Sequence, residues 1–195
     1  KFAAERSDHP VEATPLSLRA VIVDLDGVVT QTSVVHRKAW KQTFDAFLRR
    51  HHPEQAAFDD VRDYRRYVDG KPRYEGVRCF LNSRGIEAPE GDERDELEDA
   101  TVHGIGNSKN ELFRRMIYED GAPVHQDAVE RIRSWKRDGI AVAIVSSSRN
   151  CATVLDAAGL TNLFDARVDG VTLEERARAG KPAPFKERHR VTHGF

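Results

Sequence analysis

Two aspartates separated by one leucine follow a short apolar run near the start of the chain. Residues 20–23 are apolar, Asp24 and Asp26 come next, and Gly27 lets the backbone turn. Paired carboxylates at the end of a strand offer oxygen ligands for magnesium and a nucleophile beside the metal. Similar patterns occur in turns and in calcium loops, but the valines that follow leave too few oxygen ligands for an EF-hand loop. The pattern is therefore compatible with catalysis, and the rest of the chain must decide.

Two further polar residues come later in the chain and complete a set that can handle a phosphoryl group. Ser146 ends the apolar run 140–145, 120 residues after Asp26, and Lys181 follows 35 residues later. Asp24 would attack phosphorus to form an aspartyl phosphate, while Asp26 would give a proton to the leaving oxygen and later take one back. Ser146 and Lys181 would hold the phosphoryl oxygens, with Mg²⁺ on the opposite side. The predicted reaction is magnesium-dependent phosphoryl transfer.

The elements that must position these residues alternate between helix and strand in the second half of the chain. An amphipathic helix from residue 127 is followed by an uninterrupted apolar strand at 140–145, a helix at 151–158 and a strand candidate at 164–168. The first strand, apolar on both faces, is expected to be buried. This order predicts an α/β fold with a Rossmann-like parallel sheet.

The segment between the first strand and residue 121 is nearly all helical in pattern. Helices are expected from about Ser33, around 61–68 and from about 74 to 85, with a break between two helices at 104–108. The predicted domains are a polar tail at 1–17, an α/β core at 18–32 and 121–195, and an inserted helical cap at 33–120.

Composition limits the partners that the chain can take. Its 195 residues carry 31 basic and 32 acidic side chains, so no overall field favours nucleic acid or an anionic membrane surface. No apolar stretch approaches the ~20 residues of a membrane span. Cys79 and Cys151 lack nearby cysteine or histidine partners and are expected to be buried thiols, which fits a reducing cytoplasm. The expected partner is a small phosphorylated metabolite, and the oligomeric state stays open.

Three separate motifs carry a resemblance to a known family. They are the Asp-Leu-Asp-Gly-Val segment at 24–28, Ser146 after its apolar strand, and the Gly-Lys-Pro-Ala-Pro segment at 180–184. In type, order and spacing they resemble the first three motifs of the haloacid dehalogenase superfamily. The closer resemblance is to its β-phosphoglucomutase-like branch, which has a helical cap after the first strand. The residues that also fit this branch are Thr32, His36, Trp40 and the segment 146–150, so the similarity covers residues 18–184.

The resemblance implies a role for each matching residue. Asp24 would be the nucleophile, and Asp26 would be the general acid and base. Both would bind Mg²⁺, Asp26 through its backbone carbonyl. The residues implied in substrate binding are Thr32 and His36 near the acid and base, Arg73 for a distal phosphate, and Arg149 and Asn150 for phosphate or sugar, with Lys109 and Asn110 reaching from the cap.

The family's fourth motif, an acidic pair after a further strand, is not found. The segment after Pro184 contains neither an apolar strand nor paired acids. The core is therefore expected to be incomplete at its C-terminus, as in a truncated or frameshifted product or a fragment, with an apolar sheet edge exposed. Three functions stay open: a β-phosphoglucomutase-like mutase, a sugar-phosphate phosphatase, and a catalytically impaired phosphatase-fold fragment or binding module of a larger protein.

Overall fold

A computed structural model describes residues 18–182 and contains a three-stranded parallel sheet in the order β1-β2-β3. The strands are β1 (Ala20–Asp24), β2 (Ala141–Val145) and β3 (Ala166–Val168). Asp24 pairs with Val145, and Val145 pairs with Val168, so the carboxyl ends of all three strands lie level. The predicted α/β fold with a parallel sheet is confirmed. The predicted tail at 1–17 and the segment after residue 182 lie outside the described residues.

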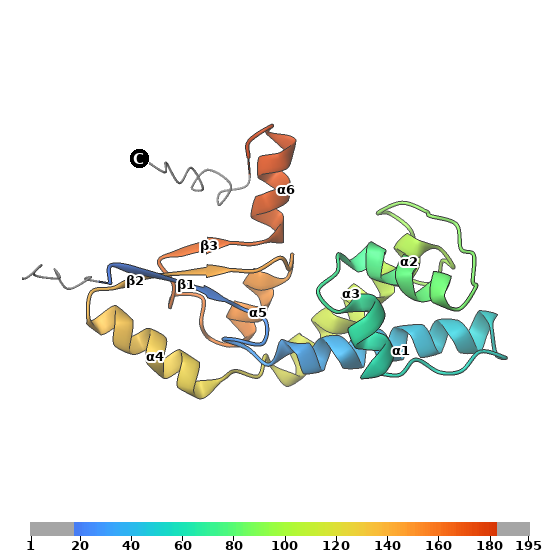
Figure 1. The fold of residues 1–195 in the computed structure, drawn as a ribbon, viewed down its shortest axis with the longest axis horizontal. Helices are drawn as coiled ribbons and strands as arrows, with labels where there is room; N and C mark the ends of the chain where they lie inside the picture. The colour runs from blue at the N-terminus through green and yellow to red at the C-terminus, as the bar shows by residue number, and fades with distance from the viewer. Residues whose placement is uncertain (1–17, 183–195) are drawn as a thin grey trace, which may run out of the picture.

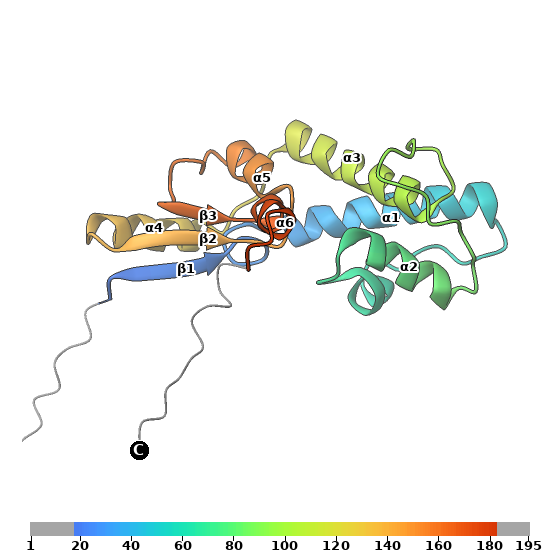
Figure 2. The ribbon, with the colours of Figure 1, turned by 90° about the horizontal axis from the view of Figure 1, so that it is seen from above.

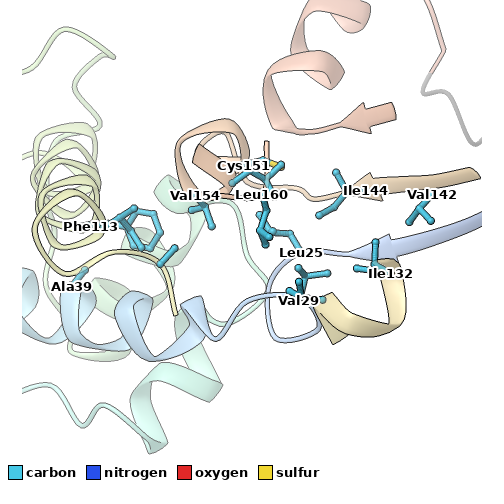
Figure 3. Close-up of a cluster of buried hydrophobic side chains, with 14 residues drawn as sticks. Leu25, Val29, Ala39, Phe113, Ile132, Val142, Ile144, Cys151, Val154 and Leu160 are labelled. Atoms are coloured by element: carbon cyan, nitrogen blue, oxygen red, sulfur yellow. The ribbon is translucent and has the colours of Figure 1, made fainter. Parts of the chain in front are cut away.

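Helices α4 (Gln126–Arg137) and α5 (Cys151–Ala157) cover one face of the sheet (Figure 1). Alternate β2 residues point into this layer, because side chains of a strand project to opposite faces in turn. The resulting cluster is drawn in Figure 3, and its fully buried members include Val142, Ile144, Ile132 and Val154.

Strand β1 is not buried on both faces, and that prediction is wrong. Its residues alternate between exposed and partly buried, and Ile22 is 57% exposed. The physical reason is that α4 and α5 cover only one face, and β1 is an edge strand within residues 18–182. An exposed apolar sheet edge is present in this part of the chain, as expected.

A helical block lies between β1 and α4 in the chain and beyond the carboxyl ends of the strands in space (Figures 1 and 2). Its helices are α1 (Thr32–His51), the π-helical turn η1 (Tyr64–Val68), α2 (Arg73–Ser83) and α3 (Val102–Asp120). A second hydrophobic cluster forms inside it, because aromatic residues recur at helical spacing along α1 and meet Phe80 of α2. The division into domains stays a prediction.

Helices α1 and α3 connect the helical block to the sheet, and they pack along each other. Helix α1 places Ala39 in the sheet cluster and Trp40 in the cluster of the helical block. Helix α3 does the same with Phe113 and Ile105. Phe113 and Ala39 are both labelled in Figure 3. The two hydrophobic clusters are therefore joined by continuous helices.

The break expected at 104–108 is absent, because α3 runs through these residues. The glycines serve close packing instead. A Cβ at Gly104 would lie 2.4 Å from the carbonyl oxygen of Asp99, and one at Gly106 would lie 2.6 Å from the Tyr74 ring. None of the described helices combines the length and hydropathy needed to cross a membrane.

Candidate active site

The turn after β1 sets the directions of the two aspartates. Leu25 and Val29 are fully buried in the sheet cluster, and the N–H of Val29 donates to the carbonyl of Leu25. Gly27 has φ +82°, a conformation that glycine adopts without strain. With the apolar side chains anchored, the carboxylate of Asp24 is exposed and that of Asp26 is half-buried.

Two hydroxyl groups hold the carboxylate of Asp26. Thr32 Oγ1 donates to one carboxylate oxygen at 2.5 Å, and Ser146 Oγ donates to the other at 3.0 Å. Thr32 begins α1 and Ser146 follows β2, so segments distant in the sequence converge on this group. Hydrogen bonds to a charged acceptor are stronger than neutral ones. Both oxygens of Asp26 are thus oriented by the protein.

Asp24 has a different environment, although it lies only two residues away. Burial raises the pKa of Asp24, the N–H of Leu25 opposes this by hydrogen bonding, and the charge of Asp26 raises the pKa further. No described side chain donates a hydrogen bond to its carboxylate. The carboxylate of Asp24 is therefore accessible within residues 18–182, and a cation at this position would favour its ionised form.

Lys109 and His36 form a buried pair between α3 and α1. Lys109 is 5% exposed, its Nζ lies 2.6 Å from Nδ1 of His36, and it faces the rings of Trp40 and Phe113. Burial lowers the pKa of Lys109 to about 7, the charge of Arg73 lowers it further, and the charge of Asp26 opposes the shift. Burial and the neighbouring Lys109 also lower the pKa of His36, so its imidazole is neutral.

The loop after Ser146 is folded tightly against the start of α6 (Gly170–Arg178). The N–H of Ser148 donates to Ser146 Oγ, and a Cβ at Gly170 would lie only 2.6 Å from the Ser147 carbonyl oxygen. Asn150 Nδ2 donates to Asn110 Oδ1 of α3 at 2.9 Å. The predicted site residue Asn150 therefore joins the sheet to the helical block.

Two arginines from different parts of the fold add positive charge near this loop. Burial lowers the pKa of Arg73, whose guanidinium also faces the Tyr74 ring at 5.1 Å, and the charge of Arg149 lowers it further. Arg149 pairs with Glu174 of α6 at 3.4 Å and with Glu93 of the helical block at 4.0 Å. The guanidinium groups of Arg73 and Arg149 are thus close enough for their charges to interact.

Lys181, also a predicted catalytic residue, makes no hydrogen bond or ion pair with the other site residues within residues 18–182. It follows α6, and its backbone N–H donates to the carbonyl of Arg176. Its side chain is exposed, and no hydrogen bond or ion pair of its ammonium group occurs within residues 18–182. Figure 1 shows α6 rising away from the sheet. Its catalytic role stays a prediction.

The donor set near Asp24 fits part of a magnesium site. Mg²⁺ is commonly held by one or two carboxylates together with water and a substrate phosphate. The free carboxylate of Asp24 suits this role, whereas the side-chain oxygens of Asp26 are engaged, which leaves its backbone carbonyl. Asp169 at the end of β3 is occupied as the cap of α6 and by Arg167. In the described part of the chain no cluster of three or more histidine, cysteine or acidic side chains suits a metal.

Three residues near the site were not predicted from the sequence. Tyr64 of η1 is buried, and burial, Asp69 and the charge of Asp26 all raise its pKa. Its only sequence signal is its place on an apolar helical face. Glu93 and Glu174 lie in acidic segments that give no signal in the sequence, because each gains its partner through the fold.

Comparison with known proteins gives concordant results. The family model described as haloacid dehalogenase-like hydrolase matches residues 18–186. A β-phosphoglucomutase of Mycobacterium bovis is 45% identical over 174 residues, which cover 87% of this chain and 66% of that protein. A β-phosphoglucomutase of Bacillus subtilis is 31% identical over 169 residues, with coverages of 86% and 66%. The chain thus spans just under two thirds of the length of these relatives.

Solved structures share the fold. The crystal structure of a β-phosphoglucomutase from Clostridium difficile aligns with a TM-score of 0.59 at 22% identity and covers 80% of this chain and 63% of that one. At this identity the similarity concerns the arrangement of sheet and helices.

Proposed function

Because the chain belongs to the haloacid dehalogenase-like hydrolases, in their β-phosphoglucomutase-like branch, we propose that it transfers phosphoryl groups of small phosphorylated sugars through an aspartyl phosphate. One observation carries the proposal. Asp26 is held by Thr32 and Ser146, while the carboxylate of Asp24, two residues away, accepts no hydrogen bond from a side chain of residues 18–182. A free nucleophile beside an oriented acid and base is the arrangement that covalent phosphoryl transfer needs.

Asp24 acts as the nucleophile in this proposal. Its carboxylate oxygen bonds to phosphorus while the bond from phosphorus to the sugar oxygen breaks, which leaves the phosphoryl group on Asp24. Asp26 in its protonated form gives its proton to the leaving oxygen. It then takes a proton from the hydroxyl or water that attacks the aspartyl phosphate, so the two half-reactions balance.

The approach of a phosphate to Asp24 requires neutralisation, because both groups are anionic. Bound Mg²⁺ would supply charge neutralisation and orientation there, held by Asp24 and the backbone carbonyl of Asp26. Lys109 adds a cation from the helical block, since its charge interacts with that of Asp26. His36, neutral and packed against Phe113, keeps the Lys109 ammonium in position.

We assign binding of the distal phosphate, the one away from Asp24, to the two arginines. Arg73 and Arg149 offer planar donors that match phosphate, and Asn150 offers a polar group beside them. This site lies between the helical block and the sheet, so movement of the block would control access. The mutase and the phosphatase reactions differ in whether a sugar hydroxyl or water meets the aspartyl phosphate.

The mutase is the first candidate, because the relatives with 45% and 31% identity are β-phosphoglucomutases. The test is turnover of β-glucose 1-phosphate with Mg²⁺, with and without a bisphosphate primer. Formation of glucose 6-phosphate that depends on the primer is expected, and Asp24→Asn should abolish it. Asp60→Asn, an exposed acid in the helical block, is the matched control and should retain activity. Release of phosphate alone would replace the mutase by a phosphatase.

A second candidate is a binding module with little catalysis. It is favoured by the lack of a cluster of three metal-ligating side chains within residues 18–182. Titration with Mg²⁺ and a fluoride mimic of phosphate separates the two candidates. Joint binding that Asp24→Asn abolishes supports the enzyme, whereas failure to bind either supports the module.

A further inference from the structure

Four charged side chains from four segments lie close enough between the helical block and the sheet for their charges to interact, and we call them the charge cluster. Arg149 follows β2, Glu174 belongs to α6, Arg73 begins α2, and Glu93 lies in the loop between α2 and α3. Arg149 Nη1 lies 3.4 Å from Glu174 Oε1 and 4.0 Å from Glu93 Oε1. Burial lowers the pKa of Arg73, the charge of Arg149 lowers it further, and the charges of Glu174 and Glu93 oppose the shift. The cluster contains two cations and two anions and is neutral as a whole.

The loop that carries Glu93 is fixed by the helical block. Asn107 of α3 donates from Nδ2 to the carbonyl oxygens of Glu93 and Asp95, at 3.3 Å and 3.1 Å. The hydroxyl of Tyr74 donates to Oδ1 of the same Asn107 at 2.9 Å. Tyr74 is the neighbour of Arg73, so one polar chain positions both a cation and an anion of the cluster.

Glu174 is positioned from the other side of the cluster. Helix α6 begins at Gly170, where Asp169 caps it by accepting from the N–H of Thr172. The same turn packs on the loop of Arg149, since the N–H of Gly170 donates to the Ser148 carbonyl. The segments that carry Glu174 and Arg149 are therefore held together on the side of the sheet. Glu93, in contrast, contacts Arg149 from the helical block.

The charge balance has a consequence for anion binding. A phosphate that binds Arg149 meets two carboxylates already paired with that guanidinium, and like charges repel at this range. Glu93 is 63% exposed and its ion pair is long, so the ion pair holds it only weakly to Arg149. Exposed ion pairs of this kind change an equilibrium by about two- to five-fold.

We propose that Glu93 is an internal competitor for Arg149, which ties the helical block to the sheet while the site is empty and is displaced by the anionic group of the substrate. This deepens the proposed function and rests on it, because the displaced contact is the one assigned to the distal phosphate. The ion pair must break before an anion can take its place on Arg149, so it sets how strongly that anion must bind. Glu93 is thereby a specificity-determining residue that disfavours weak anions.

The test measures the affinity of the chain for inorganic phosphate by calorimetry at constant pH and ionic strength. Glu93→Gln should strengthen binding two- to five-fold. The control is Glu98→Gln, which removes an equal charge from the same acidic loop at an exposed residue without an ion pair in the described structure. It should leave the affinity almost unchanged. Equal effects of the two variants, or no effect of Glu93→Gln, would overturn the proposal.

Arg149→Gln separates this proposal from the proposed function. The single variant should weaken phosphate binding, and the double variant Glu93→Gln with Arg149→Gln should bind no better than Arg149→Gln alone. If Arg149→Gln leaves phosphate binding intact, the assignment of Arg149 to the phosphate site fails, and the inference fails with it. If Arg149→Gln weakens binding but Glu93→Gln does not strengthen it, only the competitor role fails. Thermal unfolding of each variant checks that it remains folded.

Discussion

At the scale of single residues, Asp26 and Asp24 are the same side chain placed in two environments. Asp26 accepts from Thr32 and Ser146, whereas Asp24 is exposed and free. Equal carboxylates two residues apart therefore have different surroundings, and the proposed function assigns them different roles for this reason. The hydrogen bonds to Asp26 can be tested one at a time.

Replacement of Thr32 by valine removes one of these hydrogen bonds with little change in shape. A hydrogen bond to a charged group contributes about 1.5–3 kcal/mol, so turnover should fall roughly 10-fold or more, while Thr32→Ser should retain most activity. Steady-state kinetics measure the effect. Thr43→Val is the matched control, because Thr43 is also buried in α1 and its hydroxyl has no partner among the described residues. Equal losses in both valine variants would contradict the role of Thr32.

Lys109 makes stability depend on pH. Its pKa of about 7 in the folded protein lies below the ordinary value of 10.5, so the unfolded chain binds more protons between these two values. The free energy of unfolding should therefore rise with pH in this window, by about 2 kcal/mol from pH 7 to pH 9 relative to Lys109→Met. Urea unfolding of both proteins at the two pH values measures the difference. Parallel pH profiles would contradict a lowered pKa of Lys109 in the folded protein.

Site residues that directly follow a strand can be predicted from the sequence. Site residues that meet only through contacts between distant segments are much harder to predict. Asp24, Asp26 and Ser146 each follow an apolar run, and the parallel order of the strands places them at one edge. The pairing of Lys109 with His36 has no local signal, since 73 residues separate them. Glu93 likewise gains its partner only when the helical block meets the sheet.

At the scale of elements, the carboxyl ends of the strands and the turns after them carry the site. Helix α6 supports the turn after β2 through a close contact, because no side chain fits between Gly170 and the Ser147 carbonyl. The start of α6 therefore restricts movement of the loop that holds Ser146 and Arg149 towards the helix. At such a contact a small residue lets two backbone segments approach closely. Its role here is close packing and not backbone flexibility.

Gly170→Ala tests this contact. The added Cβ would lie 2.6 Å from the Ser147 carbonyl oxygen and 3.0 Å from the Arg149 nitrogen, so the loop must move. Such overpacking typically costs about 1–3 kcal/mol, which should lower the midpoint of thermal unfolding and the turnover together. Val171→Ala changes the exposed neighbour and should alter neither property strongly. A stable, fully active Gly170→Ala would show that the loop has room to adjust.

Most element types were predicted, but α6 was not, because its charged sequence indicated a loop. The environments of the elements were predicted less well. The helices and the parallel strands follow from apolar periodicity, which the sequence displays directly. The exposure of β1 and the continuity of α3 were not predicted, because they depend on which face is covered and on what lies beside Gly104 and Gly106. Pattern alone does not specify these neighbours.

At the scale of the whole molecule, α1 and α3 join two hydrophobic clusters that otherwise have separate members. Because both helices contribute to both clusters, a substitution that destabilises one cluster should also destabilise the other. The chain has two tryptophans, and each reports on a different cluster: Trp40 belongs to the helical block, and Trp135 packs against the sheet cluster.

Phe44→Ala tests the cooperation between the two clusters. Phe44 is fully buried and contacts Phe80 with ring centroids 4.1 Å apart, so its loss should cost about 3–5 kcal/mol. In a Trp40→Phe background, the fluorescence of Trp135 should report an unfolding midpoint lowered as much as the midpoint from circular dichroism. An unchanged Trp135 midpoint would show that the sheet unit unfolds independently.

The most direct test of the proposed chemistry is to find the phosphorylated residue. The protein is incubated with β-glucose 1-phosphate and Mg²⁺, quenched in acid and mapped by mass spectrometry. One phosphoryl group on the peptide that contains Asp24, present in Asp60→Asn and absent in Asp24→Asn, is the predicted result. A phosphoryl group on another residue, or one that persists in Asp24→Asn, would contradict the assignment of Asp24 as the nucleophile.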